Sequence, residues 1–386
     1  MTNAGLTNTN IQRIAINAKG HIFAIIWNGG IVRSTDNGES WVPINAGLPK
    51  VQVFALAINH HGHILAGTDE EGIFRSVDNG DNWMDFNAGL PKTQILTLAV
   101  SANGKVFASS NLGLIRSSDK GEGWMQIGTP FRGGTITSFG SNPAGHVFAS
   151  ISVSGVYRSV DSGLNWVKAN ANLPPTTVQD FASNSNEHIF AGTYYDGVYC
   201  SIDNGESWNR TATGLTNLYV NALAINKNGD IFTGTRSGVF LSSNNGEIWA
   251  PVNSGLTHDF VSTLVINARG EIFAGTEGSG IFRSVKSTTS VKENHEMLPS
   301  SFRLEQNYPN PANPTTRISF ALPRPAYVTL KIYNIIGAEV TTLVAAQLSA
   351  GSHQVEWNAN NWTNGIYFYQ LQADNIVQAK KLIVAK

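Results

Sequence analysis

The sequence has little cysteine, little charge and no long apolar run. Its 386 residues include a single cysteine, which excludes a disulfide framework and any cysteine-rich zinc or iron–sulfur site. Charged residues make up 14% and the net charge is −1, so the composition indicates neither nucleic acid nor an anionic membrane surface as a partner. No run of about 18 apolar residues occurs, so no membrane span is predicted. Apolar residues still make up 41%, which is enough for a packed core.

An eight-residue motif with the pattern SxDxGxxW recurs through the first part of the chain. Its six copies occupy residues 34–41, 76–83, 117–124, 159–166, 201–208 and 242–249. The third position holds Asp36, Asp78, Asp119, Asp161, Asp203 and Asn244, and the last holds Trp41, Trp83, Trp124, Trp166, Trp208 and Trp249. Successive copies are 41 or 42 residues apart, and a seventh copy begins but stops short of its tryptophan. Such regular spacing predicts a repeat architecture.

Each copy contains four short runs rich in Val, Ile and Phe, separated by Gly, Asn and Asp. In the second copy the runs are residues 53–59, 63–68, 73–78 and 83–90. Runs of this kind predict β-strands joined by tight turns. About seven copies of a four-stranded unit predict an all-β fold in which residues 1–285 form a seven-bladed β-propeller with an incomplete last blade.

The motif is interpreted as a structural turn. Its Asn-Gly and Ser-Gly pairs suit positive φ angles, its acid can accept hydrogen bonds from turn amides, and its Trp can pack between blades. The strings resemble Asp-box (BNR) repeats, found in sialidases, some plant-polysaccharide hydrolases, sortilin-type receptors and photosystem-assembly propellers. The resemblance covers residues 1–285 and implies that the Asp and Trp positions are structural and lie away from any active site.

The N-terminus is expected to help close the ring. Residues 3–6 (NAGL) match residues 45–48 and 87–90, which end the fourth run of the first two copies. The matching Trp would then lie before Met1, and residues 1–20 contain no signal-peptide pattern. We therefore expect the native start to lie upstream of Met1. The alternative is a last blade of three strands.

The C-terminal part differs in composition from the repeats. Residues 286–300 are polar and break the period, which predicts a linker, and the alternating segments of residues 301–386 predict a small β-sandwich. Residues 302–323, 330–344, 365–371 and 380–386 resemble the type A C-terminal sorting domain of the type IX secretion system of Bacteroidota. The resemblance implies export, a secreted or outer-membrane surface location, and the secretion machinery as a partner of residues 301–386. The alternative is an adhesive sandwich with no sorting role.

Residue types that glycan-cleaving enzymes use are present in the sequence, but they form no catalytic pattern. A sialidase needs converging arginines, but five of them share the position before the motif's Ser, so they are spread around the ring: Arg33, Arg75, Arg116, Arg158 and Arg283. A glycosidase needs two acids about 5–10 Å apart. Outside the motifs the candidates are Asp69, Glu70, Glu71, Asp180, Asp196, Asp259 and Glu277, and the sequence suggests no pairing among them. No catalytic residue is predicted.

Metal and cofactor sites are not predicted either. The HHGH string at 60–63 contains residues that bind metal ions in other proteins, but His63 shares its repeat position with His21, His146 and His188. Histidines in different blades do not converge on one ion, and Cys200 has no partner pattern, so we interpret it as a packed residue.

Binding by variable loops is the favoured function. The loops between the second and third strands and between blades share one face of a propeller, and they differ from repeat to repeat. The candidate ligand-binding residues on this face are Trp27, Asp69, Glu70, Tyr194, Tyr195, Asp196, Arg236, His258 and Asp259. Aromatic rings beside acids suit a glycan or a protein ligand. The second hypothesis is an extracellular glycoside hydrolase. Two carboxylates and an aromatic residue meeting in one pocket on this face would favour the hydrolase.

Overall fold

The computed structural model describes residues 3–117, 123–128, 130–131, 134–152, 154–285, 288, 301–348, 351–374 and 376–385. These residues form strands, turns and irregular segments, and none of them is helical. The chain divides into two compact units, Met1–Val291 and Lys292–Lys386. Of the predicted linker 286–300, only Thr288 is described, and its amide and hydroxyl donate hydrogen bonds to the carbonyl oxygen of Gly270 in the first unit.

The described residues of the first unit form antiparallel sheets that follow one another along the chain, six with four strands and one with three. Sheet 1 contains β1 (Ile11–Ile16), β2 (Ile22–Ile26), β3 (Gly30–Ser34) and β4 (Val42–Pro43), and sheet 2 contains β5 (Val53–Ile58), β6 (Ile64–Thr68), β7 (Ile73–Ser76) and β8 (Met84–Asp85). Sheet 3 contains β9 (Ile95–Val100), β10 (Val106–Ser110), β11 (Gly113–Ser117) and β12 (Trp124–Gln126), and sheet 4 contains β13 (Ile136–Ser141), β14 (Val147–Ile151), β15 (Gly155–Ser159) and β16 (Val167–Lys168). Sheet 5 contains β17 (Val178–Ser183), β18 (Ile189–Thr193), β19 (Val198–Ser201) and β20 (Asn209–Arg210), and sheet 6 contains β21 (Val220–Ile225), β22 (Ile231–Thr235), β23 (Gly238–Ser242) and β24 (Ala250–Pro251). Sheet 7 contains β25 (Val261–Ile266), β26 (Ile272–Thr276) and β27 (Gly280–Arg283).

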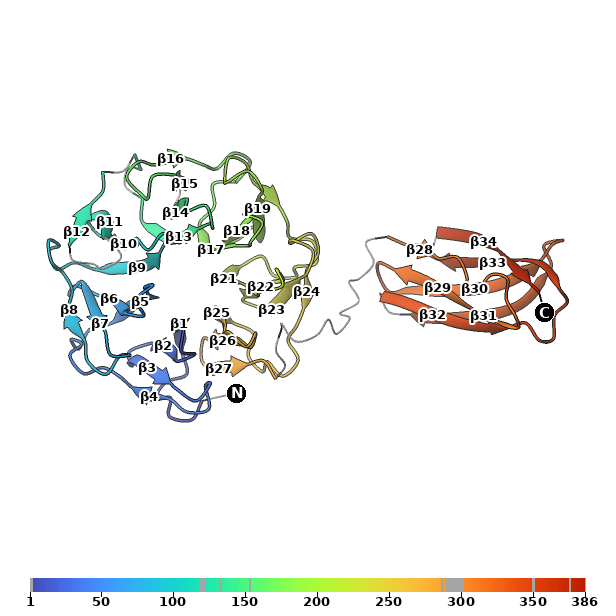
Figure 1. Cartoon of the computed structure of the whole chain (residues 1–386), viewed down its shortest axis with the longest axis horizontal. Helices are drawn as coiled ribbons and strands as arrows, with labels where there is room; N and C mark the ends of the chain where they lie inside the picture. The colour runs from blue at the N-terminus through green and yellow to red at the C-terminus, as the bar shows by residue number, and fades with distance from the viewer. Residues whose placement is uncertain are drawn as a thin grey trace. The chain divides into compact units, whose positions relative to one another are not determined.

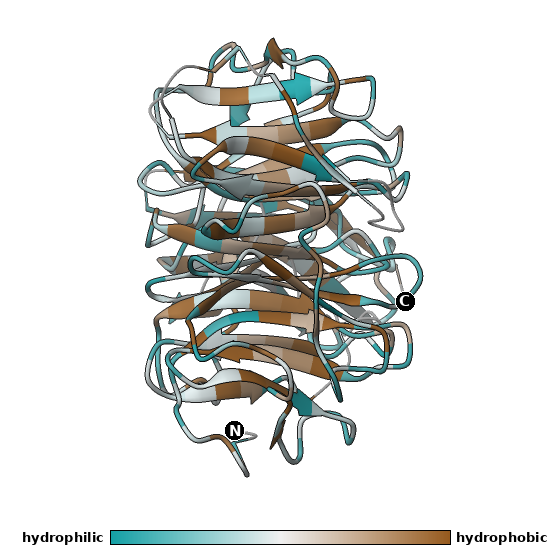
Figure 2. Ribbon diagram, turned by 90° about the vertical axis from the view of Figure 1, so that its left-hand side faces the viewer, coloured by the Kyte–Doolittle hydropathy of each residue, from teal (hydrophilic) through white to brown (hydrophobic). Residues whose placement is uncertain are grey.

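The sheets are arranged in a ring, with the first strand of each sheet nearest the centre (Figure 1). Each first strand contacts the first strand of the next sheet, and β25 contacts β1, so the ring is closed. The second strands carry apolar side chains on both faces because each sheet is covered by a neighbour on either side. Viewed from the side, apolar residues concentrate in the strands and polar residues in the loops (Figure 2).

The hydrophobic core lies between the sheets. One cluster joins Phe23 and Ile31 of sheet 1 to Val53 and Phe74 of sheet 2. The equivalent cluster at the closure joins residues of sheet 1 to Phe273 and Ile281 of sheet 7. A single sheet therefore has no core of its own, and the repeats stabilise one another.

The SxDxGxxW motif forms the turn between the third and fourth strands. In sheet 2 the Ser76 hydroxyl donates to Asp78 Oδ1 (2.8 Å) and accepts from the amide of Gly80 (2.7 Å). The amide of Asn82 donates to Asp78 Oδ1 (3.0 Å) and its side chain donates to Oδ2 (2.9 Å). The motif acids of sheets 1, 4 and 5 and Asn244 of sheet 6 likewise accept from the Ser hydroxyl and from the amide four residues on. Asp119 lies outside the described residues.

The motif tryptophans connect each sheet to the one before it. Trp83 Nε1 donates to the carbonyl of Ile44 (2.7 Å), and Trp124, Trp208 and Trp249 make the equivalent bond at 2.7, 2.9 and 2.8 Å. Trp166 instead donates to Gly163 in its own turn. The Trp41 amide donates to the carbonyl of Ala4 (2.9 Å). All six indoles are buried.

The fourth strands are shorter than the sequence predicts. Residues 83–90 were expected to form a strand, but β8 is only Met84–Asp85. The amide of Phe86 still donates to the carbonyl of Ile73, and then the Asn87 side chain replaces the backbone by accepting from the amide of Ile73 (2.8 Å). The chain leaves the sheet through Gly89, whose φ of +79° favours glycine.

The ring closes with the contacts that join the other sheets. Sheet 7 has three strands among the described residues, and the Asn3 side chain accepts from the amide of Ile281 (2.9 Å) as Asn45 accepts from Ile31 (2.8 Å). Arg283 Nη1 donates to the carbonyl of Asn37 (2.7 Å), the same bond that Arg33 makes to the next turn. The N-terminal residues thus occupy the position that ends the fourth strand in other sheets, as the NAGL match predicts.

The described residues of the second unit form seven strands in two sheets. They are β28 (Arg303–Leu304), β29 (Thr315–Leu322), β30 (Ala326–Asn334), β31 (Glu339–Leu348), β32 (Gly351–Asn358), β33 (Gly365–Ala373) and β34 (Ile376–Val384). The sheet orders are β28-β29-β32 and β31-β30-β33-β34, and their side chains share one apolar core that includes Phe320, Leu330 and Tyr369. No described segment of either unit is a helix long and apolar enough to cross a membrane.

Candidate functional site

Two residues from each sheet form a rim on the face that carries the loops between the second and third strands. In sheets 1, 2, 4, 5 and 7 the amide after the second strand donates to the carbonyl of the residue before the first strand, as Trp27 does to Asn10 and Tyr194 to Thr177, both at 3.0 Å. The rim positions after the second strands are Trp27, Asp69, Asn111, Ser152, Tyr194, Arg236 and Glu277; those before the first strands are Asn10, Gln52, Gln94, Thr135, Thr177, Tyr219 and Phe260. The framework is repeated while the side chains differ, so this face is where specificity can reside.

The aromatic rim residues gather in four consecutive sheets. Tyr194 belongs to sheet 5, Tyr219 to sheet 6, Phe260 to sheet 7 and Trp27 to sheet 1, and Tyr195 follows Tyr194 in the same loop. Sheets 2, 3 and 4 carry only Gln, Asp, Asn, Thr and Ser at these positions. We name the five aromatic residues the aromatic arc. Sequence reasoning found Trp27, Tyr194 and Tyr195 but missed the other two.

Arg236 stands at the centre of one end of the arc. Its guanidinium carbon lies 5.3, 4.5 and 5.2 Å from the ring centroids of Tyr194, Tyr219 and Phe260, and its Nη2 donates to the Tyr194 hydroxyl (3.0 Å). Tyr195 completes the cluster, with its ring 4.3 Å from Tyr194 and 4.9 Å from Tyr219. The cation holds the rings in place through their negative faces.

Tyr195 is the member of this cluster that is exposed to solvent. Its side chain is 55% exposed although two rings support it from behind. The neighbouring rings remove part of the water around its phenol, and this desolvation, with the charge of Tyr194 and a hydrogen bond to it, raises the pKa of Tyr195. The hydroxyl therefore stays neutral at ordinary pH. A rigid, supported and exposed ring of this kind can contact a ligand with little loss of conformational entropy.

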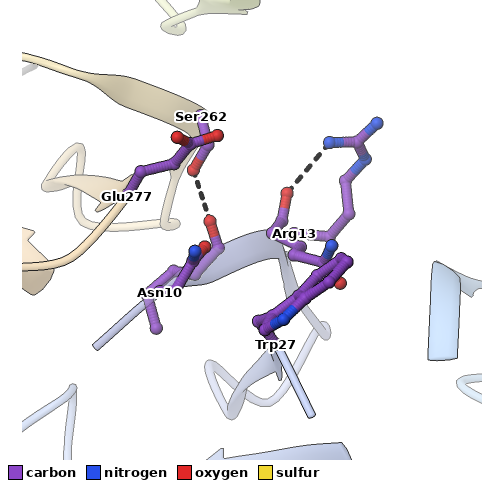
Figure 3. Close-up of a pocket in the computed structure, with 7 residues that line it drawn as sticks. Asn10, Arg13, Trp27, Ser262 and Glu277 are labelled. Atoms are coloured by element: carbon purple, nitrogen blue, oxygen red, sulfur yellow. Dashed lines mark hydrogen bonds between the residues drawn. The ribbon is translucent and has the colours of Figure 1, made fainter. Parts of the chain in front are cut away.

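A pocket of about 340 Å³ lies at the other end of the arc. It is lined by Asn10, Ile11, Gln12, Arg13, Trp27, Ser262 and Glu277 (Figure 3). Trp27 is 43% exposed. Ser262 Oγ donates to the carbonyl of Ile11 (2.5 Å) and Arg13 Nη1 to that of Gln12 (2.9 Å), so both side chains are fixed by the backbone. Among the described residues that line the pocket, Glu277 is the only carboxylate and Trp27 the only aromatic ring.

Arg13 also faces Asp180 across the centre of the ring. Both belong to innermost strands, β1 and β17, on opposite sides of the ring (Figure 1). The amides of Leu223 and Phe181 donate to the Asp180 carboxylate (2.8 and 2.9 Å), yet burial prevails and raises the pKa of Asp180 to about 6. Desolvation lowers the pKa of Arg13, and the charge of Asp180 opposes that effect.

The remaining predicted residues lie outside this group. The loop of Asp69 and Glu70 is in sheet 2, on the other side of the ring from sheet 5 (Figure 1), and Gln94 donates to the Asp69 carboxylate (2.6 Å). Asp196 borders the tyrosine pair, and its carbonyl accepts from Arg210 Nε (2.9 Å). His258 and Asp259 lie in the loop that ends at Phe260, where the Asp259 carbonyl accepts from the Gly238 amide (2.7 Å). The sequence therefore suggested one site, while the structure separates Asp69 and Glu70 from the arc.

The described residues contain no group of three His, Cys, Asp or Glu side chains that could hold a metal ion. Burial raises the pKa of the Cys200 thiol to about 11, so it is a poor nucleophile at neutral pH.

Comparison with solved structures shows that the first unit has a β-propeller fold. The WD40 β-propeller domain of Doa1 aligns with a TM-score of 0.58 and 13% identity, covering 72% of this chain and 93% of that one. The extracellular domain of BT4673 from B. thetaiotaomicron aligns with a TM-score of 0.61 and 14% identity, over 88% of this chain but only 46% of that one. PorZ, a surface component of the type IX secretion system of Porphyromonas gingivalis, aligns with a TM-score of 0.56 and 15% identity, covering 99% and 60%. At these identities the likeness shows the fold alone.

The C-terminal unit matches a known family of sorting domains. Residues 306–385 match the family of secretion system C-terminal sorting domains, the kind used by the type IX system. This confirms the predicted C-terminal sorting domain and implies a secreted or outer-membrane surface location. No curated protein matches the chain.

Proposed function

We propose that the chain is an exported binding protein that displays the aromatic arc to an extracellular glycan or protein. In this proposal residues 1–285 are a seven-bladed propeller of Asp-box repeats, residues 286–300 a linker, and residues 301–386 a β-sandwich of the type A sorting family. The propeller is a rigid support, and the sorting domain delivers it to the cell surface.

The one-sided distribution of aromatic residues carries this proposal. All five arc residues belong to four neighbouring sheets, whereas the equivalent positions of the other three sheets are small or polar. Loops without a function would have no reason to place aromatic side chains on one side only. Two of the rings, Trp27 and Tyr195, are 43% and 55% exposed, although such side chains are usually buried when they serve packing.

The pocket favours binding over hydrolysis. A hydrolase of the two-carboxylate kind needs a second acid beside the first. The pocket brings Trp27 together with a single carboxylate, Glu277, among its described lining residues. This arrangement supports recognition of a ligand and offers no acid–base pair.

A binding screen tests the proposal. The purified full chain is applied to arrays of extracellular polysaccharides and peptides, and retention is compared with that of Tyr195→Ala and of Asn111→Ala. Asn111 is an exposed rim residue outside the arc, so its variant controls for general surface effects. The proposal expects a ligand whose retention falls in Tyr195→Ala and not in Asn111→Ala. Cleavage of a retained polysaccharide would favour the hydrolase instead.

A further inference from the structure

We infer that the pocket at Trp27 is a subsite for one sugar unit of a neutral glycan, which continues along the aromatic arc. This inference rests on the proposed function and names the ligand class for the same face. It follows from the donors, acceptors and charges that line the pocket.

The pocket combines one exposed ring with planar polar groups. Figure 3 shows Glu277 next to Ser262 on one side of the labelled group and Arg13 on the other, with Trp27 below Arg13. Guanidinium and carboxylate groups each present two coplanar hydrogen-bonding atoms, a spacing that suits neighbouring hydroxyls of a sugar. The indole face can cover the C–H face of the same ring, which is apolar.

The polar groups retain hydrogen-bonding capacity. Within the described part of the chain, Arg13 donates one bond, to the Gln12 carbonyl, and has no carboxylate within ion-pair distance. Gln12 accepts from Gln52 Nε2 (3.0 Å), which leaves its own amide hydrogens for a ligand. Hydroxyl groups of a ligand could therefore replace water at these atoms without breaking protein contacts.

The charge balance indicates a neutral ligand. Among the residues that line the pocket, the charges of one cation, Arg13, and one anion, Glu277, cancel; Asp180, which acts on Arg13 from across the ring, does not line it. The carboxylate of a uronic acid would be repelled by the Glu277 carboxylate. The cationic side chains of a lysine-rich or arginine-rich peptide would be repelled by Arg13. A hydroxyl-rich neutral unit can satisfy both, because hydroxyls donate to one and accept from the other.

The size and position fit one unit of a longer chain. A volume of about 340 Å³ lies at the low end of the roughly 300–1,000 Å³ typical of small-molecule sites. The Glu277 amide donates to the carbonyl of Phe260 (3.1 Å), and Phe260 touches the Arg236 cluster. The pocket thus adjoins further ring surfaces on which neighbouring sugars can stack.

The test uses affinity electrophoresis and calorimetry of the full chain with three probes. These are neutral polysaccharides (glucans, mannans and xylans), acidic ones (polygalacturonate and alginate), and a random peptide library. Four variants are compared with the wild type: Trp27→Ala, Glu277→Gln, Tyr195→Ala and the rim control Asn111→Ala. Thermal melts confirm that each variant is folded; Trp27 and Glu277 lie on the surface, so their replacement leaves the core intact.

The inference expects binding of a neutral polysaccharide that weakens about tenfold or more in Trp27→Ala and severalfold in Glu277→Gln, with Asn111→Ala unchanged. Binding of acidic glycans or peptides alone would overturn it. The inference would also be overturned if Tyr195→Ala weakened the binding of a neutral glycan while Trp27→Ala and Glu277→Gln bound it as the wild type does. In these cases the proposed binding function survives. The absence of any ligand among the three probes would overturn both.

Discussion

At the residue scale, the acid of the SxDxGxxW motif serves structure and not catalysis. The Asn82 side chain, then its amide and the Ser76 hydroxyl, lower the pKa of Asp78 to about 2. These bonds hold a turn that includes Asn79 and Gly80 at positive φ, a conformation that unsupported residues seldom adopt. The carboxylate is saturated by its own turn, and it is therefore unsuited to acid–base catalysis.

Replacement of Asp78 should separate acceptor geometry from charge. Asp78→Ala removes the acceptor for the Asn82 amide and is expected to cost about 1–2 kcal/mol in the free energy of unfolding. Asp78→Asn should cost less, because Asn244 fills the same position in sheet 6 and accepts from Ser242 and Ile248. Urea unfolding followed by tryptophan fluorescence measures both. Equal losses in the two variants would contradict this account of the turn.

Asp180 should give the ring a characteristic pH dependence. Burial raises its pKa from 3.8 to about 6, so between these values the folded chain binds more protons than the unfolded chain. Its contribution to stability is therefore greatest at low pH and is lost as the pH rises through about 6. The difference in unfolding free energy between the wild type and Asp180→Asn should change in this direction from pH 4 to pH 7. A difference that does not vary with pH would show that Asp180 is not perturbed.

The motif acids should act in the opposite sense. Hydrogen bonds lower the pKa of Asp36, Asp78 and Asp161 to about 2, so their contribution is present above about pH 4 and is lost as the pH falls toward 2. Circular dichroism between pH 4 and pH 2 should show acid unfolding of the ring. The transition should move to higher pH in a variant that replaces Asp36 and Asp161 by Ala.

At the scale of the element, each sheet depends on its neighbour. Its core is shared with its neighbours. The motif tryptophans of sheets 2, 3, 5 and 6 donate to the sheet before them, and the arginines of sheets 1, 4 and 7 donate to the next turn around the ring. A four-stranded sheet with a two-residue last strand would have little stability alone. This explains why the motif can repeat six times without a functional role at each copy.

Trp83→Phe should test this coupling between sheets. Phenylalanine retains most of the apolar volume but loses the bond from Nε1 to the carbonyl of Ile44, and the expected cost is about 1–3 kcal/mol. Trp166→Phe is the matched control, because Trp166 donates within its own turn. Trp83→Phe should lower the free energy of unfolding measured with denaturant and should speed up amide hydrogen exchange in sheet 1. Trp166→Phe should leave hydrogen exchange in sheet 1 unchanged. Unchanged exchange in sheet 1 would contradict the coupling.

At the scale of the whole molecule, the architecture could be predicted from the sequence, whereas the site could only be partly predicted. The strands follow from a local pattern repeated every 41 or 42 residues, so one repeat predicts the others. The length of the fourth strand was wrong because Asn87 accepts a bond that backbone pairing was expected to make. Arc members lie far apart in the sequence, and only ring closure brings Trp27 beside the aromatic residues of sheets 5 to 7. Tyr219 and Phe260 could have been found by comparing the residue before each first strand, where the other repeats have Asn, Gln or Thr.

Ring closure through the N-terminal residues can be tested with a matched pair. Asn3→Ala removes the bonds to Ile281 and Ser279, and Asn45→Ala removes the equivalent bond to Ile31. If sheet 7 is completed as the other sheets are, both variants should lose about 1–3 kcal/mol of stability. A silent Asn3→Ala beside a destabilised Asn45→Ala would show that the N-terminal residues do not contribute to closure.

Export should depend on the second unit. The full chain, expressed behind a periplasmic signal sequence in a bacterium with a type IX system, should reach the surface or the medium. Removal of residues 301–386 should leave the protein in the periplasm, as fractionation and immunoblotting would show. Equal export of both forms would mean that the tail has no sorting role.

The most direct test of the central claim is the ratio of dissociation constants of a retained extracellular ligand for Tyr195→Ala and for the wild type. Tyr195 is exposed and supported by two rings, so its removal changes the arc and leaves the core intact. The account predicts a ratio of about ten or more, with Asn111→Ala giving a ratio near one. A ratio near one for Tyr195→Ala would contradict the claim that the aromatic arc binds the ligand.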